Sequence, residues 1–178
     1  MRFILMSLYI ALLASSSAHA NDCEARAGQI VARLGATIES RSSMVISLQH
    51  GAVPGGFTVG CDPTYSSPAD GADLGIGWDA DDPSESFWSM TGSAGEIITD
   101  APSKAIEAGA RACYGAARKK EQAELARGGV RYECTLTTGR NGSFYITIFR
   151  RDAAMQKKID RQFEKDKARV KNKTEAKR

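Results

Sequence analysis

Apolar and polar residues alternate along two stretches near the C-terminal end of the chain, RYECTLT at residues 131–137 and SFYITIF at residues 143–149. Such alternation places every second side chain on one face, as in a strand with one buried face. The apolar positions on that face are Tyr132, Cys134, Leu136, Phe144, Ile146 and Ile148. The Asn141-Gly142 dipeptide between the stretches is a strong turn signal. The pattern therefore predicts a β-hairpin.

Shorter segments rich in β-branched and aromatic residues precede this hairpin. Residues 37–39 and 44–50 predict either one bent strand or a hairpin around residues 41–43. FTVGC at residues 57–61 and ADLGIGWD at residues 72–79 predict two more strands, each with three apolar residues on one face. The other face of the last strand carries only glycine and aspartate. Such a face either meets solvent or lets another group approach the backbone closely, and we favour a packed element of the chain over a ligand.

Two helices are predicted from apolar spacings of three and four residues. The first begins at residues 21–22 and ends at Gly35, a typical helix stop. The second begins at Asp100, which is a favoured N-cap residue, and ends at the Gly128-Gly129 pair. Its buried stripe consists mostly of small residues, which predicts close packing on a sheet: Ile106, Ala110, Cys113 and Ala117.

The order of these elements predicts an α+β fold, with an antiparallel sheet of about five strands and two helices packed on one face. Residues 151–178 have good helix formers and neither glycine nor proline, so we expect a C-terminal basic helix after the sheet. We therefore divide the chain into a signal peptide at residues 1–20, a single α+β domain at residues 21–150 and a basic, helical tail.

The first twenty residues have the layout of a secretory signal peptide. Arg2 precedes an apolar run of about a dozen residues, and Ala18-His19-Ala20 forms a small-residue cleavage site. The run is shorter than the roughly 20 residues that span a bilayer. We expect cleavage after Ala20 and a product in the periplasm or secreted, with bacterial export favoured.

All four cysteines follow the predicted signal peptide, which in an exported chain indicates a disulfide framework. Four cysteines allow three pairings. Proximity in sequence favours Cys23 with Cys61 and Cys113 with Cys134, but the sequence does not decide between them. The chain has no C-x-x-C pair and no close Cys/His cluster, so we expect no metal site and no cofactor.

Charge is divided unevenly along the chain. Residues 150–178 contain 12 basic and 5 acidic residues, whereas residues 21–149 contain 11 basic and 16 acidic residues. The basic tail also has a narrow apolar stripe of Met155, Ile159 and Phe163. It is expected to dock on the body or to contact an anionic envelope surface. The acidic body offers no basic face with aromatic residues, so we expect no nucleic-acid binding.

The stretch WDADDPSESFW at residues 78–88 is the most suggestive candidate site. Its carboxylates are potential calcium ligands or an acid-base pair, but Pro83 breaks the EF-hand spacing. Asp, Pro and Ser are also ordinary turn residues, so a turn or protein-contact loop is favoured. The candidate binding residues are Trp78, Asp79, Asp81, Asp82, Glu85 and Trp88.

No motif in the chain specifies an enzyme. His50 is the only histidine after the predicted signal peptide, and the chain has neither a G-x-S-x-G elbow nor a phosphate-binding loop. We therefore predict an exported, disulfide-stabilised, non-catalytic binding protein, such as an inhibitor or envelope-associated factor, whose partner is another protein or an anionic envelope surface. The alternatives are a small secreted hydrolase that uses His50 or the carboxylates between Asp79 and Glu85, and a structural envelope protein held by its basic tail.

Overall fold

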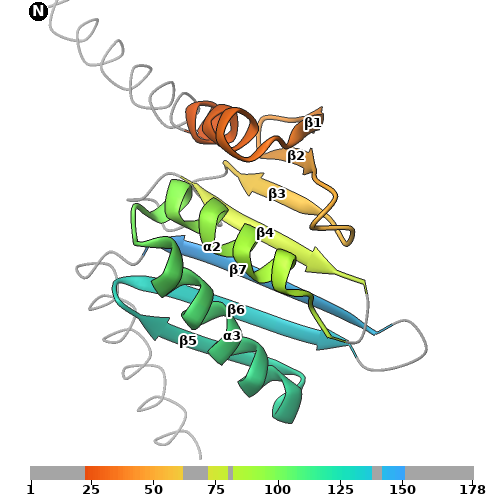
Figure 1. Cartoon of the computed structure of the whole chain (residues 1–178), viewed down its shortest axis with the longest axis vertical. Coiled ribbons are helices and arrows are strands. Elements are labelled where there is room, and N and C mark those ends of the chain that lie inside the picture. Colours follow the sequence, from red (N-terminus) through yellow and green to blue (C-terminus); the bar gives the residue numbers. More distant parts are fainter. Residues whose placement is uncertain (1–22, 62–71, 80–81, 138–141, 151–178) are drawn as a thin grey trace, which may run out of the picture.

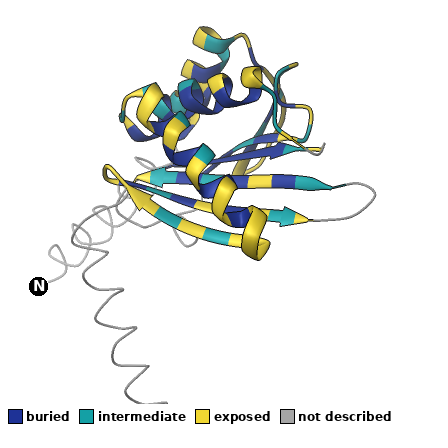
Figure 2. Cartoon of the chain, turned by 60° about the horizontal axis from the view of Figure 1, so that its bottom comes forward, coloured by how far each residue is buried: buried dark blue, intermediate teal, exposed yellow. Residues whose placement is uncertain are grey.

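The computed structural model describes residues 23–61, 72–79, 82–137 and 142–150. Within these residues, seven antiparallel strands form one sheet in the order β1-β2-β3-β4-β7-β6-β5 (Figure 1). The helices lie together on one face of this sheet, as the rotated view also shows (Figure 2). The predicted α+β class is confirmed. The predicted signal peptide and basic tail lie outside the described residues.

The elements follow one another along the chain as one helix, four strands, two helices and three strands. The helices are the N-terminal helix at residues 23–34, α2 (Glu85–Thr99) and α3 (Ser103–Lys120). The strands are β1 (Thr37–Arg41), β2 (Val45–Gln49), β3 (Phe57–Gly60), β4 (Asp73–Trp78), β5 (Gln122–Arg127), β6 (Val130–Thr137) and β7 (Ser143–Arg150).

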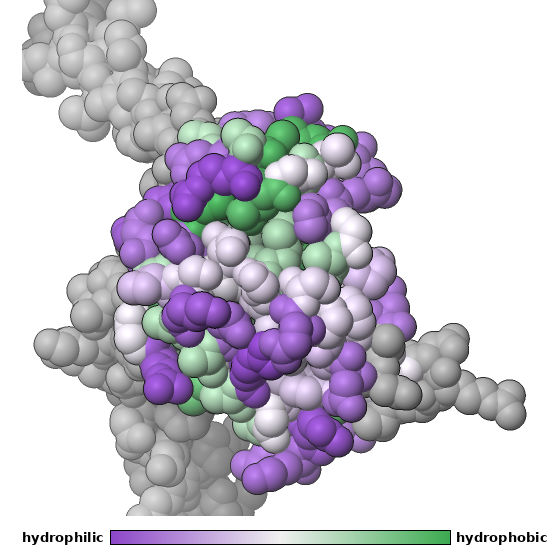
Figure 3. Space-filling model, viewed as in Figure 1, coloured by the Kyte–Doolittle hydropathy of each residue, from purple (hydrophilic) through white to green (hydrophobic). Residues whose placement is uncertain are grey.

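The core lies between the helices and the sheet, on the face that the alternating apolar residues occupy. Figure 2 shows the buried residues of the strands as dark bands. The fully buried apolar side chains include Phe57, Leu74, Ile76, Tyr132, Phe144 and Ile146 from the sheet and Ile30, Phe87 and Ile106 from the helices. The other face is mostly polar. An antiparallel sheet can expose such a face to solvent. On the helix-bearing side, apolar surface gathers near the N-terminal helix (Figure 3), where Val31 and Leu34 are partly buried.

Small residues bring α2, α3 and the sheet close together. A Cβ on Gly95 would lie 2.5 Å from Ile106, and a Cβ on Gly109 would lie 2.3 Å from the ring of Tyr132. The predicted stripe on α3, from Ile106 to Ala117, is buried. Close approach of the helix therefore depends on residues without bulky side chains at the contact.

The predicted second helix is too long. α3 ends at Lys120, and Glu121 then adopts a left-handed conformation with φ of 64°. Residues 122–127 turn back as β5, and Gly128 and Gly129, with φ of 60° and 79°, form the hairpin turn to β6. Two positive φ values in a two-residue loop match the twist of paired strands. The glycine pair thus closes a hairpin rather than ending a helix.

Of the two predicted alternatives for residues 37–50, the structure has the hairpin of two strands. The helix α2 is a third helix where we predicted none. Ser84 is the N-cap of α2, since its Oγ accepts a hydrogen bond from the backbone N–H of Phe87 at 3.2 Å. Ten of its fifteen residues are buried, so α2 lies in the interior on most of its sides.

Two disulfides join helices to the sheet. Cys23 of the N-terminal helix bonds to Cys61, which follows β3, and Cys113 of α3 bonds to Cys134 of β6. This is the pairing that proximity in sequence favours. All four cysteines are buried. Each bond therefore fixes one helix to one side of the sheet.

Two arginines hold the end of α2. Arg26 of the N-terminal helix donates to the carbonyl of Ile97, and Arg150 of β7 donates to the carbonyl of Thr99 at 3.3 Å. Both guanidinium groups also pair with the Asp100 carboxylate. Cations are favoured at a helix C-terminus, where backbone carbonyls lack helical partners. The contacts connect three elements that are distant in sequence.

Candidate binding loop and the His50 depression

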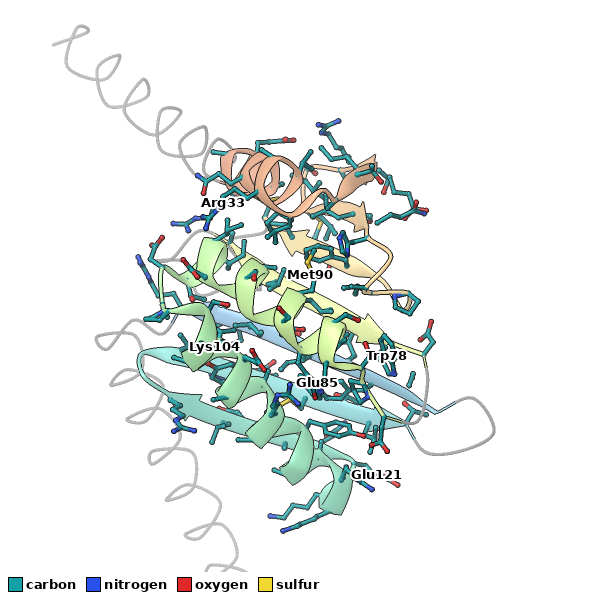
Figure 4. The ribbon with its side chains drawn as sticks, viewed as in Figure 1. Arg33, Trp78, Glu85, Met90, Lys104 and Glu121 are labelled. Atoms are coloured by element: carbon teal, nitrogen blue, oxygen red, sulfur yellow. A yellow bond between two sulfur atoms is a disulfide. The ribbon has the colours of Figure 1, made fainter. Side chains whose placement is uncertain are left out.

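Residues 78–88 do not form one continuous loop. Trp78 is the last residue of β4 and pairs with Phe144 of β7, while Glu85 is the first residue of α2. Figure 4 labels Trp78 and Glu85, which lie at one end of the sheet and helix layers. Only a short connection separates the two elements, and Asp81 in it lies outside the described residues. The candidate loop is thus a strand-to-helix junction.

Both tryptophans belong to an aromatic cluster beneath this junction. The Trp78 ring lies edge-on to Phe87 at 5.4 Å between centroids, and Trp88 lies 5.1 Å from Phe87. Trp88 is only 4% exposed and also contacts Tyr114 and Phe144. Edge-on aromatic pairs add to the stability that burial gives. Trp88 therefore anchors α2 in the core rather than offering a ring to a ligand.

Two of the carboxylates contact α3. The Tyr114 hydroxyl donates to Asp82 Oδ1 at 2.7 Å, and Arg118 lies 3.7 Å from the same oxygen. Glu85 accepts two hydrogen bonds from the Arg111 guanidinium, at 3.1 Å and 2.5 Å. Bidentate pairs of this kind fix the orientation of both side chains. The side chains of Asp82 and Glu85 nevertheless remain 71% and 85% exposed.

Arg111 connects these acidic residues with the aromatic cluster. Its guanidinium also binds Glu107 at 2.9 Å and lies over the Trp88 ring, 5.0 Å from the centroid. The hydrogen bond from Arg111 lowers the pKa of Glu107, and the hydrogen bond to Glu85 raises the pKa of Arg111. The sequence reasoning did not single out Arg111. Its position four residues after Glu107 on a helix is the signal that indicates an ion pair.

The acidic residues of the junction are not gathered into a metal site by the described part of the chain. Asp79 is exposed, and Asp82 and Glu85 point to different partners on α3. Within the described ranges, no group of three or more His, Cys, Asp or Glu side chains is placed to hold a metal ion.

His50 lies in a separate depression at the β1 end of the sheet. The depression has a volume of about 710 Å³, and its polar lining includes Thr37, Glu39 and Gln49. His50 Nδ1 accepts a hydrogen bond from the backbone N–H of Ala52 at 3.1 Å, and Gln49 Nε2 donates to Glu39 at 3.0 Å. None of the described junction carboxylates, Asp79, Asp82 and Glu85, lines this depression. His50 and the described carboxylates, the two alternatives for the predicted hydrolase, therefore lie at separate places on the protein.

The glycine-rich face of β4 contacts other parts of the protein. A Cβ on Gly77 would lie 2.1 Å from the carbonyl oxygen of Gly55, in the β2–β3 connection. A Cβ on Gly75 would lie 1.9 Å from the Tyr145 hydroxyl, which lies 3.4 Å from Thr58 Oγ1. Close packing on this face is confirmed, so the glycines have a structural role.

Comparison with known proteins gives no relative: no family model, curated protein or solved structure matches the chain. Among the described helices, none is both long and apolar enough to cross a membrane.

Proposed function

We propose that the protein is an exported, disulfide-stabilised binding protein that acts without catalysis. The observation that carries this proposal is the pair of buried disulfides, each of which fastens a helix to the sheet. Structural disulfides form in oxidising compartments such as the periplasm and the extracellular space. The predicted signal peptide supports the same compartment.

The proposed contact surface is the acidic junction between β4 and α2. Trp88 is buried beneath it, and Arg111 and Tyr114 orient two of its carboxylates while leaving them largely exposed. Exposed carboxylates on a rigid base favour a partner protein with a basic patch, because complementary charge speeds encounter and fixes orientation. Among the candidate binding residues, the carboxylates thus form the proposed surface and the buried Trp88 supports it.

The test combines fractionation with a pull-down from the native envelope. The full chain is expected in the periplasmic or secreted fraction with all four cysteines resistant to thiol labelling. An Asp79→Lys variant is expected to lose the partner that the wild type recovers, because Asp79 is exposed at the junction. Glu39→Lys, at the β1 edge, is the control and should retain it. Equal recovery by both variants would contradict the proposed surface.

A small hydrolase is the alternative, and the His50 depression is the observation that favours it. An imidazole beside Glu39 and Thr37 in a depression of about 710 Å³ has room for a substrate. If this alternative holds, purified protein hydrolyses a chromogenic ester or glycoside and His50→Ala abolishes the activity. Activity that survives His50→Ala would reject His50 as the catalytic residue.

A structural role at the envelope, with residues 151–178 as the anchor, is the second alternative. Those residues lie outside the described ranges, so the charge of +7 over residues 150–178 is its support. Deleting residues 152–178 should abolish salt-sensitive binding to anionic vesicles. Undiminished binding would refute this role.

A further inference from the structure

The strand β5 lies at one edge of the sheet. Its outer side has no partner strand in the described part of the chain. The backbone N–H of Leu136 donates to the carbonyl of Glu121 at 2.7 Å, which fixes the hydrogen-bond phase between β5 and β6. Because bonded residues alternate along an antiparallel strand, the odd-numbered residues of β5 bond to β6. The N–H and C=O groups of Gln122, Glu124 and Ala126 therefore point away from the sheet.

The two edges of the sheet differ in how they resist another strand. At the opposite edge, the pairing of β1 with β2 shifts register between Ile38 and Ser40, which twists the edge out of line. In contrast, β5 pairs with β6 in unbroken register from Gln122 to Arg127 and contains neither proline nor lysine. A register shift that disturbs strand addition is thus present at β1 and missing from β5, whose edge protection is limited to the charged residues Glu124 and Arg127.

The surface has depressions over the start of β5 and its partner strand β6. Two depressions of about 340 Å³ and 420 Å³ adjoin its first residues and share Gln122 and Thr135 in their lining. Above the strand, α3 packs on α2 through Ser103 and Glu107, so its opposite flank lies on the β5 side. Alanines at spacings of seven and four residues line that flank and are exposed: Ala105, Ala112 and Ala116.

The charge at this edge is acidic on the open face of the sheet. Glu124 and Glu133 are direct cross-strand neighbours, and their side chains are 59% and 49% exposed. Arg131 lies 3.0 Å from each of them, so one cation serves two carboxylates. A further cation on a neighbouring strand would complete the pairing, since like charges directly opposite each other are unfavourable.

We propose that β5 binds an extended segment of a partner protein as an eighth strand beside it, and that this segment alternates basic with small apolar residues. Its backbone pairs with the outward groups of Gln122, Glu124 and Ala126. Its basic side chains lie on the open face near Glu124 and Glu133, and its apolar side chains lie on the other face against Leu125 and the alanine flank of α3. This inference rests on the proposed binding function and names a second surface for it.

The experiment titrates the full, disulfide-bonded chain with a designed peptide, acetyl-Lys-Val-Lys-Val-Lys-Val-Lys-amide, and follows backbone amides by NMR. We expect shifts centred on β5 and about tenfold slower hydrogen exchange at Gln122, Glu124 and Ala126, because amides in a strand ladder exchange only when it opens. A peptide with glutamate in place of lysine should not bind. Shifts that centre elsewhere, or an equal response to both peptides, would overturn the proposal.

Matched variants separate strand pairing from charge attraction. Ala126→Pro removes an outward N–H and leaves the bonds between β5 and β6 in place, so binding should weaken about tenfold, which corresponds to about 1.4 kcal/mol. Glu124→Lys should reverse the preference between the two peptides, whereas Glu39→Lys at the other edge should change nothing. If Ala126→Pro does not fold, the reversal by Glu124→Lys decides alone.

Other outcomes distinguish this surface from the acidic junction and from self-association. If β5 does not bind the peptide while Asp79→Lys loses the native partner, the β5 inference fails and the proposed function stands. If β5 binds and Asp79→Lys has no effect, the strand edge holds and the junction fails. Slow exchange of the outward amides without peptide, in a chain that light scattering shows to be dimeric, would identify a second copy as the occupant and overturn the proposal.

Discussion

The two sides of the sheet have the same order of elements, a helix followed by three strands, but their helices make different contacts. On one side, the N-terminal helix precedes β1, β2 and β3, and on the other side α3 precedes β5, β6 and β7, with β4 between them. Each helix has one disulfide to the sheet. However, α3 lies close on Tyr132 through Gly109, whereas the N-terminal helix reaches α2 through the side chains of Arg26 and Arg33.

Both helices bury residues in the core, including Ala27 and Ile30 of the N-terminal helix. The difference indicates that the contact between α3 and the sheet depends on close approach at a glycine, whereas side-chain contacts of arginine add to the packing of the N-terminal helix. Ion pairs between exposed side chains contribute little to stability, and the side chains of the Arg33–Glu96 pair, 3.8 Å apart, are 55% and 41% exposed. The N-terminal helix should therefore depend on its disulfide more than α3 does.

The largest expected effect comes from removing each disulfide in turn. The bonds span sequence separations of 38 and 21 residues. Loss of either loop constraint is expected to cost about 3 to 4 kcal/mol of unfolding free energy. In Cys23→Ala/Cys61→Ala, hydrogen exchange should accelerate mainly in the N-terminal helix, whereas in Cys113→Ala/Cys134→Ala it should accelerate throughout β5–β7. Urea unfolding and hydrogen exchange measure both effects, and identical exchange patterns in the two variants would remove the distinction.

A smaller loss should follow from crowding the contact between α3 and the sheet. In Gly109→Ala, the new methyl group meets the Tyr132 ring, so we expect a loss of about 1 to 3 kcal/mol. Gly115→Ala on the same helix is the control, because a Cβ there meets nothing within 4 Å. Thermal unfolding compares the two. Equal melting temperatures would show that close approach at Gly109 is not needed.

The N-terminal helix should instead gain from the same kind of change. A Cβ on Gly28 meets nothing within 4 Å, and the residue is an exposed helical position. Gly28→Ala should therefore stabilise the protein by about 0.5 to 1 kcal/mol through helix propensity. The gain should appear in urea unfolding and should grow in the chain that lacks Cys23–Cys61. A loss of stability would mean that another group occupies the space beside Gly28.

The smallest expected effect concerns β4, where the two sides meet. Burial raises the pKa of Asp73 above its ordinary 3.8, the Gly60 N–H opposes this, and Glu133 adds to it. A raised carboxyl pKa means that ionisation costs folding free energy at neutral pH, and that this cost disappears as pH falls below 3.8. Asp73→Asn should therefore stabilise the protein at pH 7 and lose this advantage at pH 3. Exposed Asp79→Asn is the control, and a pH-independent gain at Asp73 would reject the explanation.

Strands with one apolar face could be predicted from the sequence because alternation carries their signal directly. The β6–β7 hairpin and the apolar faces of β3 and β4 follow from apolar residues at every second position, such as Val59 and Ile146. The β5 strand could not be predicted in this way, because Lys119 to Glu124 are good helix formers and pairing with β6 overrides that preference. In α2, glycine, serine and threonine conceal the helical spacing of Phe87, Ala94 and Ile98.

The candidate site was less predictable, because its properties depend on partners distant in sequence. Composition alone indicated an acidic loop, but it did not show that Arg111 and Tyr114 of α3 would bind Glu85 and Asp82. Likewise, nothing near His50 in the sequence indicated that the carboxylates would lie outside its depression.

The positions of the disulfides also determine how the chain responds to pulling. A force that extends the protein from its ends cannot lengthen the segments between bonded cysteines, whose separations are 38 and 21 residues. At about 3.4 Å per residue, these loops withhold roughly 200 Å of contour length. A processive protease that draws the chain through a narrow pore would meet a closed ring at Cys23 from one end and at Cys134 from the other. Degradation should therefore stall with both rings intact until a reductant opens them.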